Sequence, residues 1–438
     1  MDSRTASQGL LQFICESPCA FFTVKALRAR LDKAGFAYLP EGTSWTQAKG
    51  GKYYTVRNDS SLIAWKAGET LDAPHFQLVA AHNDSPTFKL KNVPELSGPE
   101  SYLRLDVEAY GGMIDYTWFD RPLTLAGRVY VREGRGAKEH LVHFDRDLLL
   151  IPSLAVHMDR DVNKSFGPNR QIDLLPLWSA GKLKQGSLDD LLAEELGCKA
   201  EDILGRDLYL VNREKPTIWG AADEFVSAGH LDDLQSVYAG LEAFLSSENP
   251  HDVSVLACFD NEEVGSNTKQ GAMSTLLRDT LSRVASGLGW SAEELHEAYA
   301  KSFLVSADNA HAVHPNHPEK SDEVNRCQLN HGIVIKEAAN QLYTSDAFSR
   351  SALSAILDEA KIPYQTFANR SDMRGGSTLG NLSNTQISLH AVDVGMPQLA
   401  MHSAYETTGI EDTALGIAAM KAFFEANLEI EGAESFRF

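Results

Sequence analysis

The feature that most constrains the fold is a series of short, continuous apolar runs, each ending abruptly in a polar loop. The run FQLVAA at 76–81 is the clearest: it has the length of a strand and leads into the polar loop 82–86, HNDSP. An apolar run without alternation is typical of a strand covered on both faces, and the polar residues and proline end it. Three further runs are predicted to be strands of this kind: Val253–Phe259, Ser302–Ser306 and Gln386–Val392.

Helical patterns lie between and before these runs. Apolar residues recur at helical spacing over 5–34, where the pattern stops at Gly35, and again over 234–245 and 352–360. Strands that alternate with helices predict an α/β fold, with a mixed, mostly parallel sheet flanked by helices. In such a sheet the carboxyl ends of the parallel strands face the ligand crevice.

The chain between about Pro94 and Pro216 has a different pattern. Short alternating segments such as Leu123–Arg132 and Leu141–Phe144 are separated by turn residues, and strands no longer alternate with helices. This pattern predicts a mainly β domain inserted into the α/β domain. We therefore expect residues 1–93 and 219–438 to form the α/β domain and residues 94–218 to form the insertion.

Composition argues against several classes of function. Sixty Asp and Glu residues against forty Lys and Arg residues give a formal net charge of -20, which repels nucleic acids and anionic lipid surfaces. No run approaches the roughly 18 to 20 apolar residues of a membrane span, and the first residues lack the pattern of a secretory signal. The five cysteines are scattered without a Cys-x-x-Cys pair, which favours free thiols. We expect a cytoplasmic protein that binds neither nucleic acid nor membrane.

Five groups of metal-ligating residues lie at or just beyond strand ends, or at a strand-to-helix turn: His82, Asp232, Glu262 with Glu263, Asp308 and His402. In an α/β sheet such positions converge. Two imidazoles and several carboxylates, without a thiolate, suit a pair of borderline divalent ions such as zinc, with cobalt and manganese as other candidates. The alternating pattern of an EF-hand calcium loop is absent. The sequence therefore predicts a dinuclear metal site.

The adjacent acids Glu262 and Glu263 meet a second need of such a site. Neighbouring side chains point in different directions, so one can bind metal while the other faces a water bridging the two ions. The ions lower the pKa of that water, and the free carboxylate takes its proton and returns it to the leaving amine. These residues predict a hydrolase with one glutamate as general base and acid.

Each of these residues also has a purely structural interpretation. An Asp after a strand is often a helix N-cap, which competes for Asp232 and Asp308, and the two glutamates can be first-turn acids favoured by the helix dipole. Asp84, two residues after His82, can accept the second N–H of that imidazole, or it can cap the next helix instead. The coincidence of all five groups at strand ends favours the metal site.

Long motifs carry a resemblance to a known family: HNDSP at 82–86, DNEEVGS at 260–266, ADNAHAVHPN at 307–316 and VDVGMPQLAMHS at 392–403. With YGG at 110–112 and TWFDRPLTLAGRV at 117–129, they resemble the aspartyl aminopeptidase family of dinuclear zinc peptidases over essentially the whole chain. The resemblance implies peptide substrates with a free N-terminus. It also implies a tetrahedral dodecamer built from dimers, with the α/β domain catalytic and the insertion a dimerisation domain.

The resemblance also implies individual roles. Two metal ions per subunit are held by five side chains, of which Asp232 bridges the ions: His82, Asp232, Glu263, Asp308 and His402. Glu262 is then the general acid and base. His157 of the insertion is implied to reach into a neighbouring subunit's site and steady the tetrahedral intermediate, and Lys336 is implied to bind substrate.

The sequence departs from the pattern of that family at five positions, where Arg, Met, Tyr, Arg and Arg are expected in turn: His230, Asn309, His317, Leu342 and Tyr405. Lost arginines weaken the case for a strict acidic preference, because guanidinium groups bind carboxylates in bidentate fashion. We expect an aminopeptidase that prefers N-terminal Asp or Glu, with neutral or broad specificity as the alternative. A carboxypeptidase or amidohydrolase on the same scaffold, and a catalytically silent shell protein, are further alternatives.

Overall fold

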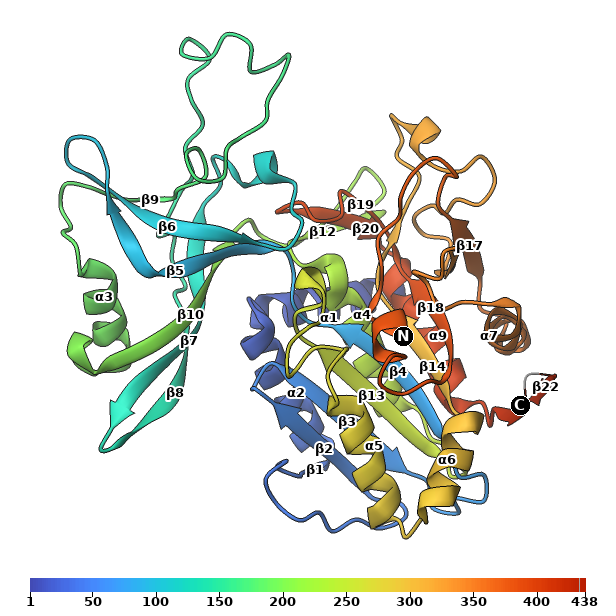
Figure 1. Cartoon of the computed structure of the whole chain (residues 1–438). Coiled ribbons are helices and arrows are strands. Elements are labelled where there is room, and N and C mark those ends of the chain that lie inside the picture. Colours follow the sequence, from blue (N-terminus) through green and yellow to red (C-terminus); the bar gives the residue numbers. More distant parts are fainter. Residues whose placement is uncertain (433) are drawn as a thin grey trace.

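The computed structural model of the chain describes residues 1–432 and 434–438. Its centre is a nine-stranded sheet, shown in Figure 1, with a six-stranded sheet beside it. The central strands, in spatial order, are β1 (Ala37–Tyr38), β2 (Lys52–Arg57), β3 (Ser61–Ala67), β13 (Val253–Phe259), β4 (Phe76–His82), β14 (Phe303–Ala307), β18 (His390–Gly395), β16 (Ile333–Glu337) and β17 (Tyr364–Ala368). The four strands in the middle, β13, β4, β14 and β18, are parallel, so the expected mixed, mostly parallel sheet is confirmed.

The apolar runs mark three of these four strands to within one residue. The fourth run differs, because β18 begins at His390 rather than at residue 386. Ile387 and Leu389 are nevertheless buried against the sheet from the preceding loop. Their apolar character therefore signals burial, which a loop residue can share with a strand residue.

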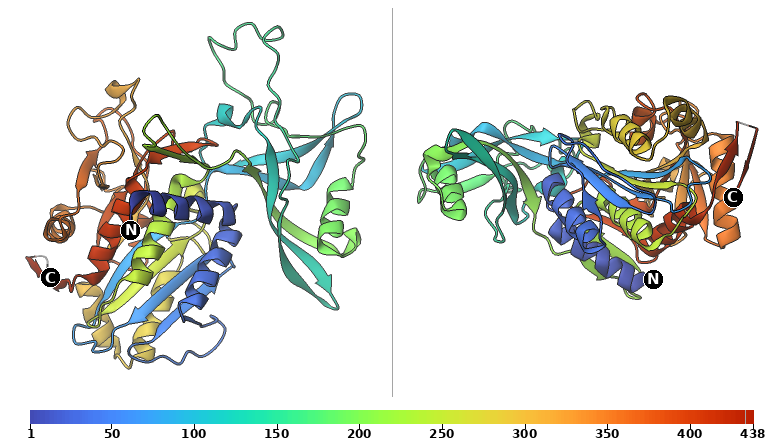
Figure 2. Two further views of the ribbon diagram at one scale, coloured as in Figure 1. Left: turned by 180° about the vertical axis from the view of Figure 1, so that it is seen from behind. Right: turned by 90° about the horizontal axis from the view of Figure 1, so that it is seen from below.

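Helices cover both faces of the central sheet, as the view from below in Figure 2 shows. One face is covered by α1 (Ser3–Glu16), α2 (Ala20–Lys33), α4 (Leu231–Ser246), α7 (Ala347–Ala360) and α9 (Asp412–Glu425). The other face is covered by α5 (Leu276–Gly287), α6 (Ala292–Lys301) and α8 (Leu379–Ser383). No helix in the described ranges combines the length and the apolar character that a membrane span requires.

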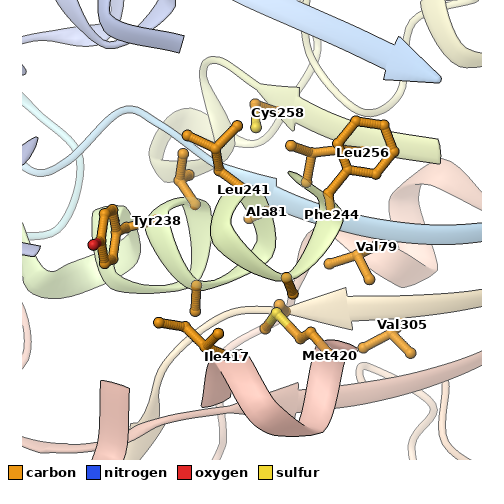
Figure 3. Packing of buried hydrophobic residues seen from close by; sticks show 14 of the residues in the cluster. Val79, Ala81, Tyr238, Leu241, Phe244, Leu256, Cys258, Val305, Ile417 and Met420 are labelled. Carbon is orange, nitrogen blue, oxygen red and sulfur yellow. The ribbon is translucent and has the colours of Figure 1, made fainter. Parts of the chain in front are cut away.

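Alternate residues of the inner strands divide between two cores. Val79 of β4 packs toward α4, whereas its neighbour Leu78 packs toward the opposite helices. Because both faces are covered, the strand reads as a continuous apolar run in the sequence. Figure 3 shows α4 packed between the strands and α9, through Val79, Leu241, Phe244, Leu256 and Met420.

The six-stranded sheet has a hydrophobic core of its own and is antiparallel. Its strands, in spatial order, are β8 (Gly136–His143), β7 (Leu123–Glu133), β10 (Ile203–Asn212), β5 (Thr87–Ser97), β6 (Tyr102–Tyr110) and β9 (Leu177–Ala180). Helix α3 (Ser187–Leu196) packs on it through Leu188 and Leu192. The long segment 144–176 joins β8 to β9 and extends away from the central sheet (Figure 1).

A small third sheet, which the sequence did not predict, lies above the carboxyl end of the central sheet. Its strands are β11 (Thr217–Trp219), β12 (Phe225–Ala228), β20 (Glu406–Gly409), β19 (Pro397–Leu399) and β15 (Ala310–His311). The short strands carry no long apolar run, which explains why the pattern missed them. They hold the segments on either side of the site described next.

Candidate active site

The residues expected to bind metal converge at the carboxyl end of the central sheet. His82 is the last residue of β4, and Asp308 directly follows β14. The pair Glu262-Glu263 begins a 3-10 turn shortly after β13. Since β13, β4 and β14 are neighbouring parallel strands, their ends bring these side chains together.

The remaining two groups lie next to strands of the small sheet. Asp232 is the second residue of α4, which follows β12, and His402 lies in the turn between β19 and β20. The strands that flank these two residues therefore belong to a different sheet from the strands that precede the other three groups. The expectation that all five groups lie near strand ends holds, although the strands are not all in one sheet.

Asp232 lies at the centre of the group. Its Oδ1 is 3.4 Å from Nε2 of His82, and its Oδ2 is 3.3 Å from Nε2 of His402. The same nitrogen of His402 is 3.3 Å from Oε1 of Glu263. Two sets of candidate ligands result, and Asp232 belongs to both: His82, Asp232 and Asp308, and Asp232, Glu263 and His402.

The residues present fit a metal site of this kind. Asp232 is only 2% exposed, and its Oδ1, like Oε1 of Glu263, has no hydrogen-bond partner within residues 1–432 and 434–438. A buried carboxylate oxygen without a partner destabilises the fold unless a cation compensates it. Imidazole nitrogens and carboxylate oxygens are ligands that zinc takes in catalytic sites.

Burial and close neighbours shift the pKa values at this site. Burial raises the pKa of the Glu262 carboxyl well above its usual range, and the charge of Asp308 adds to the rise while His82 opposes it. Burial lowers the pKa of His402, but its contacts with Asp232 and Glu263 outweigh burial and raise the pKa to about 12. A raised pKa makes the Glu262 carboxylate a stronger proton acceptor, as a proton shuttle requires.

Asp84 holds the turn that carries the two glutamates. Its Oδ1 accepts the N–H of Glu262 at 3.1 Å, and its Oδ2 accepts the N–H of Glu263 at 3.2 Å. Nδ1 of His82 lies 3.0 Å from the backbone carbonyl of Asp84 and 3.4 Å from its Oδ1. Asp84 therefore contacts the imidazole, and it caps a turn that lies far along the chain rather than the next element.

Comparison with known proteins identifies the family. Residues 13–424 match the family described as Aminopeptidase I zinc metalloprotease (M18). The chain belongs to this family. It is therefore a zinc metallo-aminopeptidase, which hydrolyses N-terminal residues from peptides, and this confirms the expected reaction in place of the carboxypeptidase alternative.

Relatives cover nearly the whole length of this M18 aminopeptidase. A Clostridium novyi protein named Probable M18 family aminopeptidase 2 is 44% identical over 422 residues, or 95% of this chain and 97% of that protein. A solved structure described as the Ape4 and Nbr1 complex has a TM-score of 0.93 at 35% identity, covering 97% of this chain and 86% of that chain. The S. cerevisiae mApe1 dodecamer has a TM-score of 0.85 at 27% identity, covering 96% of each chain.

The M18 site also contains a buried glutamate that sequence reasoning missed. Oε2 of Glu406 accepts the N–H of Asp232 at 3.0 Å, and Oε1 accepts the N–H of His402 at 2.7 Å. Burial, followed by the charge of Asp232, raises the pKa of Glu406 to about 8. Glu406 belongs to β20 of the small sheet, so no apolar run or motif in the sequence pointed to it.

A second missed acid is Asp233, which follows Asp232 on α4. Its Oδ2 accepts the backbone N–H of His82 at 3.3 Å, and its side chain is fully buried. The contact ties the end of β4 to the start of α4. The adjacency of two acids was the one signal in the sequence that could have suggested it.

Of the two other expected residues, one lies in the segment 144–176 of the insertion, and the other is buried next to Asp308. His157 is exposed in the segment 144–176, which extends away from the central sheet (Figure 1). Lys336, on β16, is only 2% exposed, and its Nζ donates to the carbonyl oxygen of Asp308 at 2.7 Å and that of Asn309 at 3.4 Å. Its Nζ is also 3.7 Å from Oδ1 of Asp308. Contact between Lys336 and substrate stays a prediction.

Proposed function

We propose that this M18 aminopeptidase releases the N-terminal residue of peptides through a dinuclear zinc site bridged by Asp232. The observation that carries the proposal is the Asp232 carboxylate, whose two oxygens face two different imidazoles at 3.4 and 3.3 Å. His82 and Asp308 complete one set of ligands, and Glu263 and His402 complete the other. Two bound zinc ions would polarise the scissile carbonyl and lower the pKa of a water molecule at the site.

Glu262 moves the proton in this mechanism. Its backbone is fixed by Asp84, and burial raises the pKa of its carboxyl. The Glu262 carboxylate accepts the proton of the attacking water and passes it to the nitrogen of the leaving peptide. The C–N bond then breaks, and a free amino acid and the shortened peptide leave. Glu263 is assigned to metal binding rather than to proton transfer, because its Oε1 faces Nε2 of His402.

For the N-terminal residue, we propose a preference for Asp or Glu. In the described part of the chain, Lys336 is the only lysine or arginine whose side chain forms an ion pair with one of the metal-ligand candidates. A cation beside the site suits a substrate carboxylate. The bonds of Lys336 to two backbone carbonyls favour the alternative, a neutral or broad specificity, since they occupy two of its three N–H donors.

For the assembly, we propose a tetrahedral dodecamer in which residues 94–218 form the dimerisation domain. The segment 144–176 supports contact with a second copy of the chain, because it leaves several large apolar side chains exposed: Leu154, Val156, Met158, Phe166 and Ile172. His157 lies among them, so docking of this segment would carry the imidazole toward a neighbouring subunit. The likeness to the mApe1 dodecamer also supports a closed assembly.

Release of the first residue from a peptide panel tests the proposed mechanism and specificity. The peptides differ only at their N-terminal residue, and each is also prepared with a blocked N-terminus. We expect zinc-dependent release that is fastest for Asp or Glu, abolished by chelation and absent from the blocked peptides. Faster release of neutral residues would replace the proposed acidic preference. Full activity after verified removal of all metal would contradict the metal mechanism.

A further inference from the structure

The end of β6 reaches the proposed catalytic site through consecutive residues. The hydroxyl of Tyr110 donates to Oδ2 of Asp84 at 2.7 Å. Two residues later, the carbonyl oxygen of Gly112 accepts a hydrogen bond from Nδ1 of His402 at 2.7 Å. This bond leaves Nε2 of His402, the atom that faces Asp232, free to bind an ion. The inserted sheet therefore touches both sides of the site.

Gly111, between these two residues, lets the strand end approach closely. Its φ of +82° lies in the left-handed region, which favours glycine. A Cβ added there would lie 3.1 Å from Cβ of Glu263 and 3.4 Å from Cα of Pro86. The backbone at Gly111 is thus packed against the turn that carries the two glutamates, and a larger residue would push the strand end away.

The hydrogen bonds around Tyr110 fix the direction of its hydroxyl. Nδ2 of Asn261 donates to the hydroxyl oxygen of Tyr110 at 2.8 Å, so the hydroxyl hydrogen is left to point at Asp84. Asp84 receives two further hydrogen bonds, both from the backbone of the 262–263 turn. Among the described residues, Tyr110 supplies the only side-chain hydrogen bond to Asp84 other than its contact with His82.

We propose that Tyr110 is a positioning residue for Glu262, so that the inserted sheet sets the geometry of proton transfer. The inference rests on the proposed role of Glu262. Tyr110 fixes Oδ2 of Asp84, and the Asp84 carboxylate fixes the backbone of the turn from which the Glu262 side chain extends. Without the hydroxyl, the Asp84 carboxylate can rotate and the turn can shift. A misplacement of about 1 Å in a reacting group can slow turnover by about 100-fold.

A neighbouring tyrosine provides a matched control. Tyr209, on β10, packs edge-on against Tyr110, with ring centroids 5.6 Å apart and an interplanar angle of 81°. The described residues make no hydrogen bond to the Tyr209 hydroxyl, in contrast to the two at Tyr110. Tyr110→Phe and Tyr209→Phe therefore each remove one hydroxyl and keep the ring packing. Only the first change removes a bond to Asp84.

The test is a double-mutant cycle between Tyr110→Phe and Glu262→Gln, measured at saturating zinc with Tyr209→Phe alongside. We expect Tyr110→Phe to lower kcat about 10-fold, the lower end of the range for outer-shell partners, with KM within about 2-fold of the wild type. Tyr209→Phe should change kcat less than about 2-fold. In the Glu262→Gln background, Tyr110→Phe should change the residual rate less than about 2-fold, because residues that act together are not additive.

Three results would overturn the inference. One is a kcat for Tyr110→Phe within about 2-fold of the wild type. Another is an equal fold-loss in both backgrounds, which would show that Tyr110 acts independently of Glu262. A third is a zinc content that falls in parallel with kcat, which would place its effect on metal binding. If Glu262→Gln loses most of its turnover while Tyr110→Phe is fully active, only the inference fails. Full activity of Glu262→Gln removes the proposed role of Glu262 as well.

Discussion

The regions around the two large sheets differ in which side chains they bury: one buries polar groups, and the other leaves apolar groups exposed. At the carboxyl end of the central sheet, acidic and imidazole groups such as Asp232 and His82 are buried, and Oδ1 of Asp232 has no hydrogen-bond partner among the described residues. Beside the six-stranded sheet, the segment 144–176 that connects β8 to β9 leaves apolar side chains such as Met158, which is 75% exposed, open to solvent. Each arrangement costs free energy in an isolated, metal-free chain.

The difference indicates what each region binds. A buried carboxylate oxygen without a donor is compensated by a cation, whereas an exposed apolar cluster is compensated by another apolar surface. In the proposed function, the carboxyl end of the central sheet binds the ions, and the segment 144–176 contacts another subunit. The six-stranded sheet meets the site at the end of β6, where Tyr110 contacts Asp84 and the following Gly112 contacts His402.

The largest effect should come from the central region, through Glu262→Gln. The amide is nearly the same shape but cannot accept the proton of water, so kcat should fall about 1,000-fold while zinc content stays at the wild-type level. Steady-state kinetics with elemental analysis checks both. The exposed Glu323→Gln is the matched control and should leave kcat unchanged. Retained turnover in the Glu262 variant would assign the proton transfer to another group.

His402→Ala should have the next largest effect. The variant removes one imidazole that faces both Asp232 and Glu263, so we expect about one zinc ion fewer per subunit. Loss of an outer-shell partner already costs about 10- to 100-fold, so kcat/KM should fall at least about 100-fold. Elemental analysis of the dialysed protein measures the zinc. His296→Ala, at an exposed position on α6, is the control, and full zinc occupancy in His402→Ala would contradict the ligand assignment.

The sequence predicts the central region better than the contacts around it. Strands such as β4 and β13 are covered on both faces, so their buried residues form continuous runs whose polar ends are visible. Glu406 and Tyr110 give no such signal. Glu406 accepts the backbone N–H of Asp232 from a distant part of the chain, and the Tyr110 hydroxyl donates to the side-chain carboxylate of Asp84. Roles that arise from contacts between distant segments have no local pattern.

The inserted region was predicted in type but not in detail. The alternating pattern over 123–132 matches β7, yet β5 already begins at Thr87, earlier than the change of pattern near Pro94 suggested. The reason is that residues 87–90, which are mostly buried, directly follow the polar loop after β4, so the sequence alone does not separate them from that loop. Thr87 of β5 pairs with Tyr110 of β6, and this pairing brings β6 to the site. It is a contact between two separate strands, which no local sequence pattern indicates.

Core substitutions compare the stability of the two regions directly. Leu256→Ala in the central core and Leu208→Ala in the six-stranded core each leave a cavity at a fully buried site. Each should lower the free energy of unfolding by about 2–5 kcal/mol, measured by urea denaturation. Leu204→Ala, 48% exposed on β10, should change it by less than about 0.5 kcal/mol. If the strand end at Tyr110 joins the regions, Leu208→Ala should lose activity at lower urea than the wild type.

The smallest effect on the folded chain should come from Met158→Ser in the segment 144–176. The side chain is 75% exposed, so the free energy of unfolding of one subunit should change by less than about 0.5 kcal/mol. The assembly should nevertheless weaken, because a contact between copies would bury this side chain. Val324→Ser, at a position 80% exposed outside the segment, controls for the loss of an exposed apolar residue. In sedimentation velocity, we expect smaller species for Met158→Ser alone. Unchanged sedimentation of both variants would mean that Met158 is not part of a subunit contact. The buried polar site would then still be explained by bound ions, but the exposed apolar segment 144–176 would not be explained by a partner subunit.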